Sequence, residues 1–141
     1  MAGNGALDPL LTQPVRLITA LAQSSEARLR LLLILLFLEY PAYAAYVRSI
    51  ARKLDPAACL TLQCYYTAAV CLVKKYRPNG GASLPDHFSA DLGLELLHDP
   101  DENLCMLAKR HKQFSGSFVN WLVTYQHIEH VWQKELKNRM K

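Results

Sequence analysis

Apolar residues recur at helical spacing along most of this chain. Residues 118–139 carry apolar side chains three or four positions apart, which predicts a helix with one apolar stripe. That stripe consists of Phe118, Trp121, Leu122, Tyr125, Ile128, Trp132 and Leu136. Residues 31–38 and 60–73 are apolar on nearly every side, which predicts two helices at the centre of the fold. No segment alternates apolar and polar residues as a half-buried strand does, so we expect no sheet.

Prolines and their neighbours indicate where the helices begin. Several prolines open an apolar stretch, and proline suits the first turn of a helix because its missing N–H would be unpaired there. Asp55 and Asp99 each precede such a proline and are expected to cap the helix. Gly116 is expected to end one helix and Ser117 to cap the next. The expected helices are 14–22, 26–38, 41–54, 56–76, 100–115 and 118–139, with a short helical turn at 84–91 between Ser83 and Gly93.

These elements predict an all-α fold, an irregular bundle of five to six main helices plus the short turn. The 141 residues suffice for one domain, and 51% of them are hydrophobic against 20% charged, which is a globular composition. A loop near 77–83, rich in Pro and Gly, separates a four-helix N-terminal half from a C-terminal helical pair. The longest strongly apolar run has eight residues, whereas a bilayer crossing needs about 20. We therefore expect no contact with a membrane.

The four cysteines favour a reduced, cytoplasmic protein, because no secretory signal precedes them. Cys64 and Cys71 are two helical turns apart, about 10 Å, which is too far for one metal ion. Buried, inert thiols are the favoured interpretation for all four, although the dipole of a helix could lower the pKa of Cys59. The four are Cys59, Cys64, Cys71 and Cys105.

Sequence motifs of enzymes are missing, so we expect a protein that is not an enzyme and holds no cofactor. His127 and His130 share one helix surface with Glu129, but no further ligands complete a metal site. The HEPN ribonucleases are similar in size and helicity, yet their Arg–x4–6–His motif has no counterpart here. The chain also lacks a phosphate-binding glycine loop and a G-x-S-x-G elbow. A helical enzyme whose site the sequence does not reveal stays open as an alternative, to be revived by a buried polar cluster with a perturbed His or Asp.

Charge is segregated along the chain. The net charge is +4, but residues 78–102 carry six acids and no Lys or Arg, between two basic segments. The basic residues gather in the last turns of four expected helices, where the helix dipole favours cations. This dipole effect alone would explain the clusters; the functional alternative is contact with phosphate groups of a nucleic acid. The clusters are Arg48, Arg52 and Lys53; Lys74, Lys75 and Arg77; Lys109, Arg110 and Lys112; and Lys134, Lys137, Arg139 and Lys141.

The first functional hypothesis is therefore a non-catalytic subunit of a larger assembly that handles nucleic acid. Small helical subunits of CRISPR effector complexes, which serve in antiviral defence, are similar in size, helicity and mild basicity. That similarity implies other protein subunits as partners and contact with single-stranded DNA or RNA, or with an RNA–DNA heteroduplex, through its backbone.

The second hypothesis is a protein-interaction module, such as an antitoxin, an immunity protein or an adaptor. Tyr40, Tyr43 and Tyr46 are spaced by three and can line one helix face, where they would bind a protein partner. A core role for the same rings is the alternative, and loss of stability on their substitution would reveal it.

Overall fold

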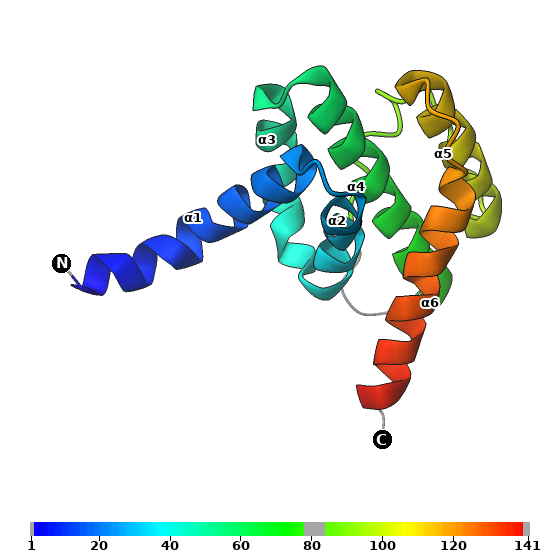
Figure 1. Cartoon of the computed structure of the whole chain (residues 1–141). Helices are drawn as coiled ribbons and strands as arrows, with labels where there is room; N and C mark the ends of the chain where they lie inside the picture. Colours follow the sequence, from blue (N-terminus) through cyan, green and yellow to red (C-terminus); the bar gives the residue numbers. More distant parts are fainter. Residues whose placement is uncertain (1, 78–83, 140–141) are drawn as a thin grey trace.

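The computed structural model describes the backbone of residues 2–77 and 84–139 and the side chains of residues 13–77 and 84–139 (Figure 1). It is 77% helical, with six α-helices and no strand in the described ranges, so the predicted all-α bundle is confirmed. The elements are α1 (Ala2–Gln23), α2 (Ala27–Glu39), the 3-10 helix η1 (Pro41–Tyr46), α3 (Val47–Lys53), α4 (Pro56–Tyr76), α5 (Pro100–Ser115) and α6 (Trp121–Arg139).

Helix α4 is the centre of the bundle, as the apolar pattern of residues 60–73 predicts. Every residue from 64 to 73 is buried, and helices α1, α2, α3 and α5 all pack against α4. Tyr66 of α4 meets Phe37 of α2 edge to face, with 5.0 Å between ring centroids. Its hydroxyl donates to the carbonyl of Pro85 at 2.7 Å, which fastens the segment after the loop to the core. The second half of the chain is thereby packed against the first.

By length and composition alone, α4 could also cross a membrane. The bent pair formed by α2 and residues 41–53 passes the same test, with 112° between its two parts. However, 67% of the most apolar window of α4 is buried inside the protein. That degree of burial is typical of a core helix.

Helix α2 is only half central, and here the prediction for residues 31–38 is wrong in part. Leu33, Ile34 and Phe37 are fully buried against the core. Leu32 is 42% exposed, however, and Leu35 is half-buried. The reason is that α4 packs against one side of α2, whereas its contacts with α1, η1 and α6 leave part of the remaining surface uncovered. A leucine-rich surface therefore faces outward.

Local capping follows the sequence at several helix ends. The Asp55 carboxylate accepts the Ala58 N–H at 2.8 Å at the start of α4, and Asp99 caps α5. Gly116 ends α5 with φ +66°, a left-handed conformation that costs glycine little. Gly93 likewise closes a turn with φ +68°, but this turn spans residues 89–93 rather than the expected 84–91, because residues 84–87 have no regular structure. The expected cap at Ser83 lies outside the described residues.

Three helix boundaries differ from the prediction. Helix α1 begins at Ala2 rather than at residue 14 and so contains Pro9 and Pro14, each of which removes one backbone hydrogen bond without ending the helix. The expected helix 41–54 is divided into η1 and α3. Helix α6 begins at Trp121, since the Asn120 carboxamide accepts the Val123 N–H and caps it, while the Ser117 hydroxyl bonds Val119 instead. Phe118 therefore lies outside the helix and is 96% exposed, contrary to its place in the predicted stripe.

Candidate nucleic-acid interface

The four basic clusters divide between the two ends of the bundle. Lys75 at the end of α4 pairs with Asp101 at the start of α5, at 2.8 Å, so these two helices run antiparallel. Helix α4 has 21 residues and is thus about 30 Å long. One end of the bundle carries Arg48, Arg52, Lys53, Lys109, Arg110 and Lys112. The other end carries Lys74, Lys75, Arg77, Lys134, Lys137 and Arg139, whereas Lys141 lies outside the described residues.

Several of these cations are bound within the protein. Lys75 contacts both Asp101 and Glu129, and these contacts raise its pKa against the opposing effect of desolvation. Arg139 pairs with Glu39, and the guanidinium of Arg77 lies over the ring of Trp132, 5.3 Å from its centroid. The guanidinium groups of Arg48 and Arg110 donate to backbone carbonyls. Within the four clusters, the exposed cations that make no such contact in the described ranges are Arg52, Lys53, Lys74, Lys109, Lys112, Lys134 and Lys137.

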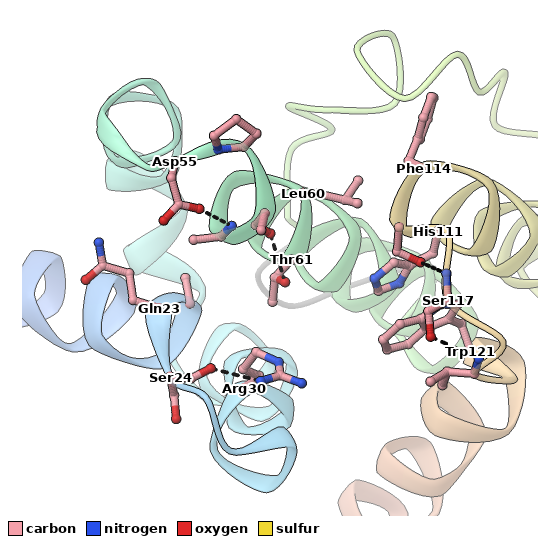
Figure 2. Close-up of a pocket in the computed structure, with 16 residues that line it drawn as sticks. Gln23, Ser24, Arg30, Asp55, Leu60, Thr61, His111, Phe114, Ser117 and Trp121 are labelled. Atoms are coloured by element: carbon pink, nitrogen blue, oxygen red, sulfur yellow. Dashed lines mark hydrogen bonds between the residues drawn. The ribbon is translucent and has the colours of Figure 1, made fainter.

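At the first end, a pocket of about 600 Å³ lies among α1, α2, α4, α5 and the start of α6 (Figure 2). Its floor is the first turns of α4, with Leu60 and Thr61. The last residues of α5 form one wall, and the connection between α1 and α2 forms the other. Helices α3 and α5 both end near this pocket, but their terminal Lys and Arg residues do not line it: Arg48 and Arg52 line a second pocket and Lys53 a third.

Among the described residues, Arg30 is the one Lys or Arg that lines this pocket. Its Nη1 donates to the Ser24 carbonyl at 2.9 Å, and the guanidinium is half-buried. No carboxylate lies within 4.0 Å of it among the described residues. Figure 2 shows Arg30 and His111 reaching toward the pocket from opposite sides. A guanidinium without a counter-ion at the edge of a pocket favours an anionic ligand, because its remaining N–H groups keep their donor capacity.

His111 is buried and its ring stacks on Trp121, with 3.6 Å between centroids and 8° between planes. Burial, followed by the charge of Arg30, lowers its pKa to about 3. Its Nδ1 lies 2.7 Å from the hydroxyl of buried Tyr125. That hydroxyl has no other acceptor in the described structure, so we assign it as the donor, which places the ring proton on Nε2. His111 is therefore a neutral ring with an N–H available to the pocket.

Hydroxyl groups and aromatic rings complete the rim of the pocket. The hydroxyls of Ser24 and Ser117 each accept a backbone N–H, at 3.1 Å, and keep their own protons to donate. Phe114 lines the pocket and is 52% exposed. Phe118 lies beyond the end of α5, in the connection to α6; its ring is almost fully exposed, but it is not one of the residues that line the pocket. Of the residues that the structure describes, Asp55 is the only acid on the wall, and one of its oxygens accepts the Ala58 N–H.

The sequence reasoning missed Arg30 and His111. Arg30 is one of two arginines at the start of an otherwise apolar helix, and that isolated charge is the available signal. His111 offers none, because its importance comes from Trp121 and Tyr125, which belong to the next helix.

The three tyrosines proposed for protein binding do not share one exposed face. Tyr40 is 55% exposed and stacks on Tyr43, with 5.2 Å between centroids. Tyr43 and Tyr46 are half-buried and pack against the core from η1. Tyr40 is therefore the member of the trio that presents most of its ring to a partner.

The thiols differ from one another in ways that the sequence does not show. Cys64 and Cys71 are buried, and desolvation raises the pKa of each to about 12. Cys59 is half-buried; desolvation, then Asp91 and Asp55, raise its pKa, which is opposite to the alternative of a pKa lowered by the helix dipole. Cys105 is exposed, contrary to the expectation of a buried thiol.

Histidines on α6 do not build a metal site with the groups around them. His127 and His130 are both exposed. Within the part of the chain that the structure describes, no three His, Cys, Asp or Glu side chains are grouped as metal ligands.

Comparison of the chain with protein-family models, curated proteins and solved structures finds no match.

Proposed function

We propose that this protein is a non-catalytic helical subunit of a nucleic-acid-handling assembly. It contacts the sugar–phosphate backbone of a single strand at the end of the bundle where the Arg30 pocket opens. The observation that carries the proposal is Arg30 itself, a half-buried cation without a carboxylate partner in the described structure, at the edge of a pocket of about 600 Å³.

The surroundings of Arg30 match what a single strand requires. Single-strand binding combines positive charge along the backbone with aromatic rings on which bases stack. Exposed lysines at the ends of α3 and α5 supply further charge, and Phe114 and Phe118 supply exposed rings. The N–H of His111 and the rim hydroxyls add donors for phosphate oxygens. Since none of these groups reads a base edge in a fixed geometry, the proposed contact is independent of sequence.

Two features favour binding over catalysis in this pocket. The buried His111 is the perturbed histidine that would revive an enzyme hypothesis, but a pKa of about 3 makes it a poor proton acceptor near neutral pH. Its Nδ1 accepts a hydrogen bond from the hydroxyl of Tyr125, and not from a serine or cysteine that it could activate. The pocket thus offers donors for an anion.

Binding can be measured by fluorescence anisotropy with short labelled poly(U) and poly(dT) strands at low salt. We expect affinity to fall with a log–log salt slope of about −0.7 per phosphate contact. Arg30→Gln should weaken binding by about tenfold, the value of one charge-assisted hydrogen bond, and should make the slope shallower by about 0.7. Arg30→Lys should retain part of the affinity, because the charge remains.

Lys134→Gln is the matched control, since it removes one exposed charge at the opposite end of the bundle. Phe118→Ala tests stacking without disturbing the core, because the ring is almost fully exposed; we expect a loss of about 1–3 kcal/mol if a base stacks on it. Absence of binding to both strands at low salt would refute the proposal. Equal losses in Arg30→Gln and Lys134→Gln would move the contact away from this pocket.

A further inference from the structure

The side of α2 that faces away from the core carries a regular stripe of residues. The stripe consists of Arg28, Leu32, Leu35 and Glu39. Their spacings of four, three and four residues place them along one line of the helix. Leu32 is 42% exposed, and Arg28 is exposed at one end of the line. Glu39 closes the other end and is half-buried. The stripe therefore has a positive charge at its first residue, two apolar residues in the middle and a negative charge at its last residue.

An apolar groove of about 280 Å³ runs beside this stripe, between α2 and α1. Leucines make up most of its lining, and two of them, Leu17 and Leu32, are among the exposed large hydrophobic residues of the protein. The groove is lined by Leu17, Leu21, Leu32, Leu35, Leu36, Glu39 and Tyr40. Helices α1, α4 and α6 and the 3-10 helix η1 all contact α2, yet Leu17 remains 37% and Leu32 42% exposed, and in Figure 1 most of α1 extends away from α2. A surface of this kind on a folded domain is typical of an interface.

The order of charges identifies the partner. If a second copy of α2 lies antiparallel on the first, Arg28 meets Glu39 of the second copy at both ends, and Leu32 meets Leu35 in the middle. A parallel arrangement would place Arg28 on Arg28 and Glu39 on Glu39, which is repulsive. The stripe is thus complementary to itself about a two-fold axis, the usual symmetry of homodimers. Both carboxylate oxygens of Glu39 already accept N–H groups of Arg139, but a carboxylate has about four acceptor positions and can accept from a second guanidinium.

We propose that two copies of this chain form a homodimer through the α2 stripe and its groove, with their α2 helices antiparallel. The proposal is independent of nucleic-acid binding, because the Arg30 side chain contributes to a different pocket. Burial of the leucines stabilises the dimer, and the two Arg28–Glu39 pairs set its orientation.

The test is a charge exchange followed by sedimentation velocity from low to high micromolar concentration. Wild-type protein should reach twice the monomer mass of 15.9 kDa. Arg28→Glu alone and Glu39→Arg alone each place like charges together at both ends, so each should dimerise on the order of tenfold or more weakly. An equimolar mixture of the two variants should form a heterodimer, because its glutamates and arginines again oppose one another.

Leu32→Asn should also give a monomer. Val123→Asn is the control: it changes an exposed apolar residue of α6, away from the stripe on α2, and should leave the dimer intact. Circular dichroism on every variant checks that the helices remain folded. Three outcomes would each overturn the proposal: wild-type protein that stays monomeric, a Leu32→Asn variant that dimerises like wild type, or a mixture that fails to recover dimers although both single variants have lost them.

Discussion

Acidification should destabilise this protein through one buried histidine, His111. The perturbation is a fall in pH from 7 to 5. In the folded state, burial and the charge of Arg30 lower the pKa of His111 to about 3, against an ordinary value of 6.5. The unfolded chain therefore takes up a proton at this residue over a range of pH in which the folded protein does not. Stability is consequently present above pH 6.5 and is lost as the pH falls toward 3.

The magnitude follows from the difference between the two pKa values. Each pH unit between the two pKa values costs about 1.4 kcal/mol of unfolding free energy, and the loss per unit becomes smaller as the pH approaches the upper pKa of 6.5. From pH 7 to pH 5 the loss at His111 is about 2 kcal/mol, a large fraction of the stability of an ordinary domain. The free energy of unfolding can be measured by urea denaturation at both pH values.

His111→Gln isolates this contribution, because glutamine cannot titrate and its amide can still meet the Tyr125 hydroxyl. His87 contributes a change of the same sign, since desolvation and then Arg48 lower its pKa, so only the difference between variant and wild type is informative. The variant should lose about 2 kcal/mol less than wild type between pH 7 and 5. His127→Gln, at an exposed position, should behave like wild type.

Equal pH dependence in wild type and His111→Gln would refute the reasoning. Should His111→Gln fail to fold, the wild-type protein still provides the test by NMR. The ring signals of His111 should keep their neutral chemical shifts at pH 5, and protonation of this ring above pH 5 would contradict the buried, neutral assignment.

Two further predictions concern a helix start and the thiols. Asp55→Ala should lower the free energy of unfolding by about 1 kcal/mol, because it removes the acceptor for the Ala58 N–H at the start of α4. Urea denaturation measures this loss, with Asp55→Asn as the conservative control. An unchanged denaturation midpoint in Asp55→Ala would contradict the cap. A disulfide reagent added to the native protein should label the exposed thiol of Cys105 rapidly. Cys64 and Cys71 should react only at the rate of unfolding, since they are buried and desolvation raises the pKa of each to about 12. Rapid labelling of either buried thiol would contradict this prediction and show that the core opens locally.

Much of the fold could be predicted because its signals are local. The helix caps at Asp55 and Asp99 and the left-handed Gly116 depend on a few neighbouring residues, so the sequence contains what is needed to locate them. The apolar run of residues 60–73 correctly predicts the central helix, because a helix without a polar face must be covered on all sides. The boundaries fail where one local signal competes with another, as at Asn120, which caps α6 in place of Ser117.

The candidate sites, in contrast, could be predicted only in fragments. Tyr40 and the basic clusters are visible in the sequence, but their grouping is not, because antiparallel packing of α4 and α5 sends successive helix ends to opposite sides. Arg30 and His111 are 81 positions apart in the numbering and line one pocket only after five segments have packed together.

By itself, then, the sequence determined the helical class, the buried central helix and most of the caps, all of which follow from periodicity and from contacts within one or two turns. Only the tertiary structure decided that one side of α2 stays uncovered, that Arg30 has no carboxylate beside it in the described ranges, and that His111 is neutral. The physical reason is that burial, pKa and charge pairing depend on which helices become neighbours, and this is set by the packing of distant segments rather than by any local pattern.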